Sequence, residues 1–254
     1  MAEYVSVDGA RLEFAWYGPP PPHAPTIIFL HEGLGSASQW RGFPAELCAR
    51  LGCGGLVYSR CGHGRSDALT GPRDVDFMHH EATVVLPRLI EVFELQRPIL
   101  VGHSDGASIA LIYAGSVGDP FALILEAPHV FVEDVTVKRI AELRDLYQTT
   151  DLRTRLSRHH SNIDTLFQYW TDVWLRPEFR GWNIEAYLPD VTCPTLVIQG
   201  KQDEYGTDIQ VNTLTAALGG RCEGVMLDRC GHAPHVDQRL RVEELMTQFV
   251  RALE

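Results

Sequence analysis

The chain has 254 residues and a formal net charge of −11 at pH 7. This length fits one large α/β domain, or one domain that carries an insertion. A negative chain lacks the positive footprint that binds a phosphate backbone, so no nucleic-acid partner is expected. The sequence contains no run of about 18 apolar residues and no basic, apolar leader, so we expect neither a membrane span nor secretion. We therefore predict a cytoplasmic protein in which the six cysteines are free thiols.

The first segment, residues 4–14, predicts a β-hairpin that turns at Asp8-Gly9. After the proline run at 19–22, short and continuous apolar runs recur along the chain. Each of them fits a strand that is buried on both faces, as in a parallel sheet. These runs are 26–30, 55–58, 99–101, 123–125, 196–198 and 224–227.

Helical patterns lie between several of these runs. They cover residues 43–51, 84–95, 104–114 and 239–253. Strands and helices that alternate in this way form βαβ units and a sheet covered on both faces. The predicted fold class is therefore α/β, with a mostly parallel central sheet and helices on both of its faces.

The alternation stops between residues 129 and 189, where only helical patterns are found. Ile163, Leu166, Phe167, Trp170 and Trp174 recur at helical spacing and form one apolar stripe. We predict a core domain of residues 1–128 and 190–254 with a helical cap, or lid, at 129–189. The alternative is that the stripe packs against the body as ordinary core.

The sequence Gly102-His103-Ser104-Asp105-Gly106 matches GxSxG. It follows the run 99–101 and precedes the helical pattern at 104–114, which is the strand–turn–helix context of a nucleophile elbow. A serine hydroxyl is a weak nucleophile and needs a base, which in turn needs a carboxylate to orient it. We predict that Ser104 is the catalytic nucleophile.

Candidates for the base and the carboxylate follow later in the chain. His232 comes after the strand-like run 224–227 and is the predicted base, with His235 as the rival. Asp203 follows the run 196–198, near the carboxyl end of a strand, where active sites of open α/β sheets gather. It is the predicted acid, although the adjacent Glu204 could replace it.

Four segments together resemble the α/β-hydrolase fold superfamily, in the branch with a helical cap. They are His31-Glu32-Gly33-Leu34-Gly35, the turn 60–67 with sequence RCGHGRSD, the GxSxG at Ser104, and Gly231-His232. The resemblance implies an oxyanion hole built from the backbone N–H groups of Gly33 and Asp105. Glu32 departs from the family, where glycine is common. Because a carboxylate there would oppose the developing charge, we expect it to point away or to pair with a cation.

These residues predict hydrolysis of a carboxylic ester, or of a related acyl bond, through an acyl-enzyme intermediate. The apolar stripe favours a small hydrophobic or aromatic substrate, bound by Leu34, His103, Trp170 and Trp174. Three alternatives stay open: a C–C bond hydrolase of aromatic ring-cleavage products, an acyltransferase, and a ligand-binding protein without turnover.

No cofactor is expected, because no GxGxxG or phosphate-binding loop occurs. The pairs His79-His80 and His159-His160 lack the spacing of metal ligands, so no metal is expected either. The expected partner is a small-molecule substrate, and a homo-oligomer is left open.

Overall fold

The computed structural model describes residues 3–253, in which eight strands form one sheet in the order β1-β2-β4-β3-β5-β6-β7-β8. The pairs β1–β2 and β2–β4 are antiparallel, and the other pairs are parallel. The predicted α/β class and mostly parallel sheet are therefore confirmed. The strands are β1 (Glu3–Val7), β2 (Ala10–Tyr17), β3 (Thr26–Leu30), β4 (Gly54–Tyr58), β5 (Ile99–His103), β6 (Ala122–Glu126), β7 (Thr195–Gly200) and β8 (Cys222–Leu227).

The hairpin turns at the predicted dipeptide. Val7 pairs with Ala10, and Asp8 and Gly9 between them have φ values of 50° and 74°. Two successive residues with positive φ match the right-handed twist of the strands that they join, and Asp-Gly is a preferred sequence for such a turn.

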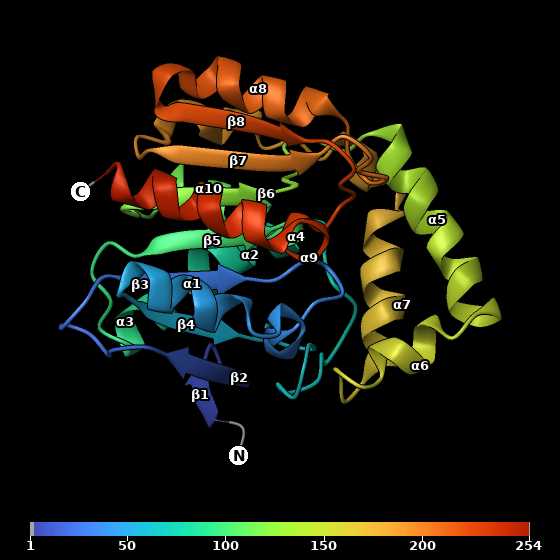
Figure 1. Cartoon of the computed structure of the whole chain (residues 1–254). Coiled ribbons are helices and arrows are strands. Elements are labelled where there is room, and N and C mark those ends of the chain that lie inside the picture. Colours follow the sequence, from blue (N-terminus) through green and yellow to red (C-terminus); the bar gives the residue numbers. More distant parts are fainter. Residues whose placement is uncertain (1–2, 254) are drawn as a thin grey trace.

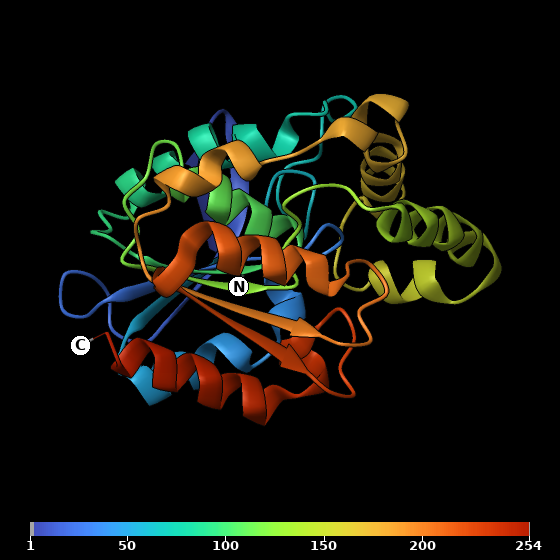
Figure 2. The same ribbon diagram turned by 90° about the horizontal axis from the view of Figure 1, so that it is seen from above.

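Helices cover both faces of the sheet (Figures 1 and 2). One face carries α1 (Phe43–Leu51) and α10 (Arg239–Arg251), which share one hydrophobic core with Ile27 and Phe29 of β3. The other face carries three further helices, which share one hydrophobic core with Ile28 and Leu30, the alternate residues of the same strand. Successive side chains of β3 therefore enter two different cores, which is why its sequence is apolar throughout. These three helices are α3 (Leu86–Val92), α4 (Asp105–Ala114) and α8 (Asp208–Leu218).

The helical segment predicted at 84–95 begins earlier than expected. It starts with α2 (Phe77–His80), continues through a π-helical turn at Glu81–Val85, and ends in α3 at Val92. Pro87 has no N–H to bond the carbonyl four residues before it, and a wider turn precedes it. His80 and Glu81 consequently lie inside the helical segment, before the range 84–95 that the sequence predicted for it.

Between β6 and β7 the chain is mainly helical. It contains α5 (Asp134–Thr149), α6 (Leu152–Leu156) and α7 (Ile163–Trp174), followed by 3₁₀ turns at Pro177–Gly181 and Glu185–Asp190. These helices lie beyond the end of the sheet toward which β7 and β8 point (Figure 1). An isolated β-bridge joins Phe131 to Asn183, where no strand was predicted.

The last short helix is α9 (Pro234–Asp237), which precedes α10. Across residues 3–253, no helix has both the length and the apolar character that a membrane crossing requires.

Candidate active site

Ser104 lies at the sharp turn between β5 and α4, with φ 54° and ψ −118°. A positive φ is strained for a residue with a side chain, and such strain collects at functional sites. The two glycines of the motif allow the turn to form. A Cβ on Gly102 would lie 2.5 Å from the carbonyl oxygen of Gly106, and a Cβ on Gly106 would lie 2.0 Å from that of Leu30. Strand, turn and helix thus approach more closely than any other residue permits.

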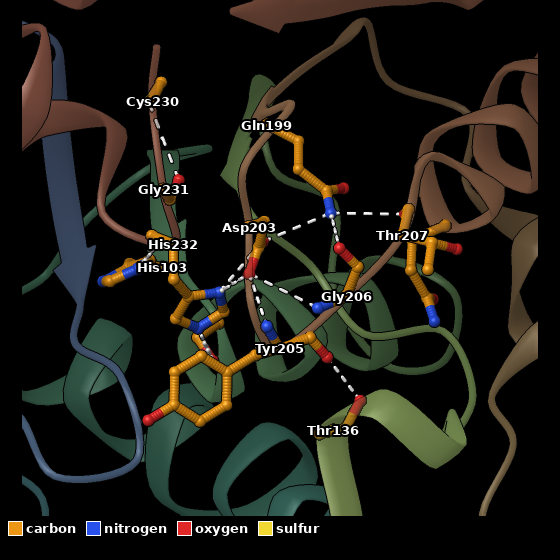
Figure 3. Close-up of polar contacts among 12 residues, drawn as sticks. His103, Thr136, Gln199, Asp203, Tyr205, Gly206, Thr207, Cys230, Gly231 and His232 are labelled. Carbon is orange, nitrogen blue, oxygen red and sulfur yellow. Dashed lines mark hydrogen bonds and ion pairs between the residues drawn. The ribbon is translucent and has the colours of Figure 1, made fainter. Parts of the chain in front are cut away.

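Hydrogen bonds join Ser104 to His232 and His232 to Asp203, the second of which is drawn in Figure 3. The distance from Ser104 Oγ to His232 Nε2 is 2.9 Å. His232 Nδ1 lies 2.8 Å and 3.0 Å from the two carboxylate oxygens of Asp203. Because a carboxylate only accepts, the Nδ1–H donates to Asp203, and Nε2 is left to accept from the serine hydroxyl.

Asp203 is held by the loop that follows β7. Its Oδ1 accepts from the backbone N–H groups of Tyr205 at 2.8 Å and Gly206 at 3.3 Å, and its Oδ2 accepts from Gln199 Nε2 at 3.2 Å. Burial alone would raise the pKa of this carboxyl, but the charge and hydrogen bond of His232 and the Tyr205 N–H bring the pKa below its usual value. Asp203 is therefore ionised. Of the two adjacent candidates, it is Asp203 that contacts His232, rather than Glu204.

His235 is engaged elsewhere. Its ring Nδ1 and its backbone N–H both donate to one oxygen of Glu126, at 2.8 Å and 3.0 Å. Burial raises the pKa of Glu126, but His235 offsets this and the net pKa is lowered. The structure thus places His235 on a buried carboxylate at the end of β6, while His232 is the histidine that reaches Ser104.

The loop after β3, which carries Gly33, is fixed by Arg60. The Arg60 guanidinium donates to the carbonyl oxygens of His31 at 2.5 Å and Glu32 at 2.9 Å. The indole of Trp170 lies directly against Gly33, so that a Cβ there would be 2.1 Å from Trp170 Nε1. Sequence reasoning singled out the segment that begins with Arg60 but missed this role, because the contact joins residues 28 positions apart.

Asp105, the other predicted oxyanion residue, is the first residue of α4. Its side chain is buried, and its Oδ2 accepts from Trp170 Nε1 at 3.1 Å. Burial raises the pKa of this carboxyl. The backbone N–H of Asp105 belongs to the first turn of α4, where helix N–H groups have no partner within the helix and the dipole favours negative charge.

Glu32 pairs with a cation, which was one of the two arrangements expected for it. Its Oε2 lies 3.6 Å from His103 Nδ1. Burial would lower the pKa of His103, but the nearby carboxylate of Glu32 outweighs burial and raises the pKa to about 9. The pKa of Glu32 is lowered far below its usual value, also against the effect of burial. His103 Nε2 donates to the carbonyl oxygen of His232 at 2.7 Å, so the pair also supports the loop of the base.

This ion pair predicts a pH-dependent contribution to stability. Because the pKa of His103 is raised by folding, the contribution is complete below about pH 6.5, the ordinary histidine pKa, and is lost as the pH rises through about 9. We expect Glu32→Gln to be less stable than the wild type by on the order of 2–3 kcal/mol near pH 6.5, with the difference vanishing by about pH 9.5. Urea unfolding across this range measures it.

Glu91→Gln is the matched control, because Glu91 forms an exposed pair with Arg88. We expect that variant to differ from the wild type by less than about 1 kcal/mol at every pH. If the Glu32→Gln difference stays constant between pH 6.5 and 9.5, the two groups do not form an ion pair in the folded protein.

A small cavity opens beside Ser104 and His232, with a volume of about 90 Å³. It is lined by Leu34, Trp170 and Trp174, which were among the candidate substrate-binding residues. His103 does not reach this cavity, because it is 3% exposed and is held between Glu32 and the His232 carbonyl. The sequence also missed several lining residues, namely His129, Thr136, Ile140, Leu143 and Tyr205.

The residues of the apolar stripe of α7 differ in whether they line the cavity. All five of its residues are buried. Trp170 and Trp174 reach the cavity, whereas Ile163, Leu166 and Phe167 pack into the core, with the Phe167 ring stacked at 3.8 Å on Tyr147. Trp170 and Trp174 thus belong to the packed core and also line the cavity, whereas the other three residues only pack.

At least one histidine of each adjacent pair, His79-His80 and His159-His160, contacts another part of the chain. His80 Nε2 lies 2.9 Å from an oxygen of Asp8, and His160 Nδ1 accepts from the N–H of Gly64 at 3.0 Å. In the part of the chain that the structure describes, no group of three or more histidine, cysteine or acidic side chains is arranged to hold a metal ion.

A serine, a histidine and a carboxylate joined at the carboxyl edge of a mostly parallel sheet, in the chain order Ser…Asp…His, is the arrangement found in hydrolases of the α/β type. The match to known families agrees with this class. The chain belongs to the alpha/beta hydrolase family, whose model matches residues 27–245.

Individual relatives are distant. A proline iminopeptidase from Saccharolobus solfataricus is 23% identical over 266 residues, which cover 88% of this chain and 84% of the relative. Among solved structures, an enol-lactonase from Burkholderia xenovorans LB400 matches with a TM-score of 0.77 at 20% identity, over 98% of this chain and all of the other. A meta-cleavage product hydrolase from Pseudomonas fluorescens IP01 matches with a TM-score of 0.69 at 16% identity, over 99% and 98% of the two chains. The two solved structures share the fold of this chain. Together with the iminopeptidase, they support a hydrolase.

Proposed function

We propose that the protein hydrolyses a short-chain carboxylic ester, or a closely related acyl bond, through an acyl-enzyme intermediate. The observation that carries the proposal is the hydrogen-bonded chain from Ser104 through His232 to Asp203. A serine hydroxyl gains nucleophilicity when a neutral imidazole takes its proton, and an ionised carboxylate stabilises the imidazolium that forms.

The steps follow from these contacts. Ser104 Oγ attacks the substrate carbonyl while His232 Nε2 takes the hydroxyl proton. The N–H groups of Gly33 and Asp105 stabilise the oxyanion, and His232 then returns the proton to the leaving oxygen. Water attacks the acyl-enzyme with His232 again as the base. We further propose that residues 129–189 act as a cap, because Trp170 and Trp174 from this insertion close the cavity.

The cavity favours a small acyl group. Its volume is about 90 Å³, well below the roughly 300–1,000 Å³ of typical ligand pockets. Its lining includes two carboxyl side chains, Glu32 and Asp105, and no arginine or lysine among the described residues. A dianionic ring-cleavage product would meet no cation there, so this lining supports ester cleavage over the C–C bond alternative.

A second candidate function is the release of a small N-terminal residue from a peptide. The similarity to a proline iminopeptidase raises it, and one feature of the cavity favours it: the buried carboxyl of Asp105 lines the wall and could bind an amine. An ester is ranked first because it needs only the triad and the oxyanion hole, whereas an amide has a poorer leaving group.

A substrate screen tests the ranking. We expect saturable hydrolysis of p-nitrophenyl acetate or propionate, with kcat/KM at least about tenfold higher than for the octanoate, since extra methylenes do not fit the cavity. A ring-fission dienoate and prolyl p-nitroanilide should be slower still. Efficient dienoate or anilide cleavage with only trace esterase activity would reverse the ranking and leave the triad assignment unchanged.

A further inference from the structure

A second pocket lies between the helical insertion and the sheet domain, and its volume is about 340 Å³. This volume falls within the range of about 300–1,000 Å³ that is usual for pockets that bind small molecules. One wall comes from α6, through Leu152, Arg155 and Leu156. Another comes from the segment between β3 and α1, through Arg41. The proposed mechanism uses none of these four side chains.

This pocket adjoins the active site. Glu32 lines both the pocket and the cavity beside Ser104. Two other residues of the pocket wall are chain neighbours of catalytic residues, since His103 precedes Ser104 and Ala233 follows His232. A ligand in the pocket therefore touches the loops that carry the nucleophile and the base.

The pocket differs from the cavity in the charge of its wall. Arg41 and Arg155 line the pocket, whereas the described lining of the cavity has no arginine or lysine. Among residues 3–253, Glu32 is the acidic side chain of the pocket wall. The protonated ring of His103, 3.6 Å away, balances its charge. The two arginines consequently make this wall positive near neutral pH, in a chain whose net charge is −11, and such a wall attracts an anion.

The guanidinium groups of both arginines are accessible to a ligand. Arg41 is exposed, and its side chain forms no ion pair within residues 3–253. Arg155 Nε lies 3.3 Å from Asp151 Oδ1, and the two side chains are 60% and 72% exposed. An ion pair this exposed contributes little to stability, so the carboxylate of a ligand can replace that of Asp151.

The wall also offers a neutral donor and an apolar surface. Gln39 Oε1 lies 3.1 Å from Ser36 Oγ and 3.0 Å from His160 Nε2, and the amide NH₂ of Gln39 is left to donate to a ligand. Leu152 and Leu156 are half-buried and border the same space. The ligand that fits this wall is an anion with an apolar body.

Arg41 has a backbone conformation that is strained for a residue with a side chain. Its φ is 53° and its ψ is −135°, directly after the 3₁₀ turn Ala37–Trp40. Glycine adopts such angles without strain, and residues that tolerate strain collect at functional sites. Arginine at a position that suits glycine indicates that the side chain has a function there.

We propose that this pocket binds the carboxylate of a small organic anion between Arg41 and Arg155, with the apolar part of the anion against Leu152 and Leu156. The planar guanidinium group matches the geometry of a carboxylate. The carboxylate belongs either to the substrate or to a separate molecule that binds beside it. The inference goes beyond the proposed function and does not depend on which bond Ser104 attacks.

A ¹⁹F NMR titration tests binding directly, with 4-fluorobenzoate as the probe and 4-fluorobenzamide as a neutral compound of nearly the same shape. We expect the benzoate to bind the wild type at least about tenfold more tightly than the benzamide. Arg41→Gln and Arg155→Gln should each raise the Kd of the benzoate at least about tenfold, because a charge-assisted hydrogen bond is lost. Arg41→Lys keeps the charge and should recover part of the affinity.

Arg221→Gln is the matched control. It changes the net charge by the same amount at an exposed arginine in the 3₁₀ turn Gly219–Arg221, which precedes β8 and does not line the pocket. We expect the Kd of 4-fluorobenzoate to change less than about twofold in this variant. The melting temperature of each variant shows that it is folded.

Two esters with similar leaving groups, 4-acetoxybenzoate and 4-acetoxybenzamide, identify the source of the carboxylate. If it belongs to the substrate, kcat/KM is at least about tenfold higher for the charged ester in the wild type, and the ratio falls in both pocket variants. If it belongs to a separate molecule, the two esters react alike. In that case 4-fluorobenzoate saturably changes kcat/KM for p-nitrophenyl acetate in the wild type and not in the pocket variants. Either result supports the pocket.

Three results would overturn the inference. The first is equal affinity for the charged and neutral probes. The second is an unchanged Kd in folded Arg41→Gln and Arg155→Gln, which would place the probe elsewhere, for example at the oxyanion N–H groups. The third is an equal loss in all three glutamine variants, which indicates a non-specific effect of net charge. If the wild type binds the benzoate but hydrolyses neither ester, the proposed function fails and the pocket inference stands.

Discussion

Replacing Ser104 with alanine is expected to lower kcat by about 10⁴- to 10⁶-fold, because the hydroxyl is the proposed covalent nucleophile. The fold should persist. The substitution removes one oxygen from a side chain whose contact is with His232, and the glycines that permit the turn are unchanged. Steady-state kinetics on a short p-nitrophenyl ester measures the loss, and the melting temperature of the variant shows that it is folded.

A serine-directed fluorophosphonate gives a second measurement that does not depend on knowing the substrate. Intact mass and peptide mapping should locate one adduct, at Ser104, and none in the alanine variant. Ser116→Ala is the matched control, since Ser116 is exposed just beyond the end of the same helix. Labelling at another residue, or near-wild-type turnover by the Ser104 variant, would refute the central assignment.

His232→Ala should cause a loss of comparable size, about 10⁴- to 10⁶-fold in kcat, since a serine without its base is nearly inert. His235→Ala is expected to act on stability instead. Glu126 is fully buried, and removing its partner leaves an uncompensated charge in the core, which typically costs about 3–5 kcal/mol. Kinetics below the melting transition and urea unfolding separate the two effects.

The two histidines are three positions apart, so this comparison also tests which of them is the base. We expect the folded fraction of His235→Ala to keep activity within about tenfold of the wild type, since its ring contacts Glu126 rather than Ser104. Loss of chemistry in His235→Ala with full activity in His232→Ala would reassign the base.

The sequence by itself determined the architecture and the position of the nucleophile. Apolar runs such as 26–30 and 99–101 predicted buried strands, because the period of side chains along a strand is a local property of the backbone. Ser104 could be located for the same reason: the glycines at 102 and 106 are needed within the turn itself. The family resemblance rested on these local segments, and it is confirmed by the match over residues 27–245.

Only the tertiary structure showed which of two adjacent residues reaches the site and which residues far apart in the sequence contact each other. Asp203 and Glu204 carry the same chemistry one residue apart, and only the path of the loop after β7 selects the one that faces His232. The pairing of Glu32 with His103 joins residues 71 positions apart. No local pattern specifies such a contact, because it depends on how the β3 and β5 loops meet at the edge of the sheet.

His129 illustrates the same division. Its place directly after the strand 122–126 could have been noticed, since residues at the carboxyl ends of parallel strands face the active-site edge. That its ring would stand beside His232 and Trp174, with a nitrogen lacking any partner in residues 3–253, depends on three segments that meet only in the folded chain. Sequence patterns determine the secondary structure that places a residue near a site, whereas packing among distant segments determines which groups its side chain contacts.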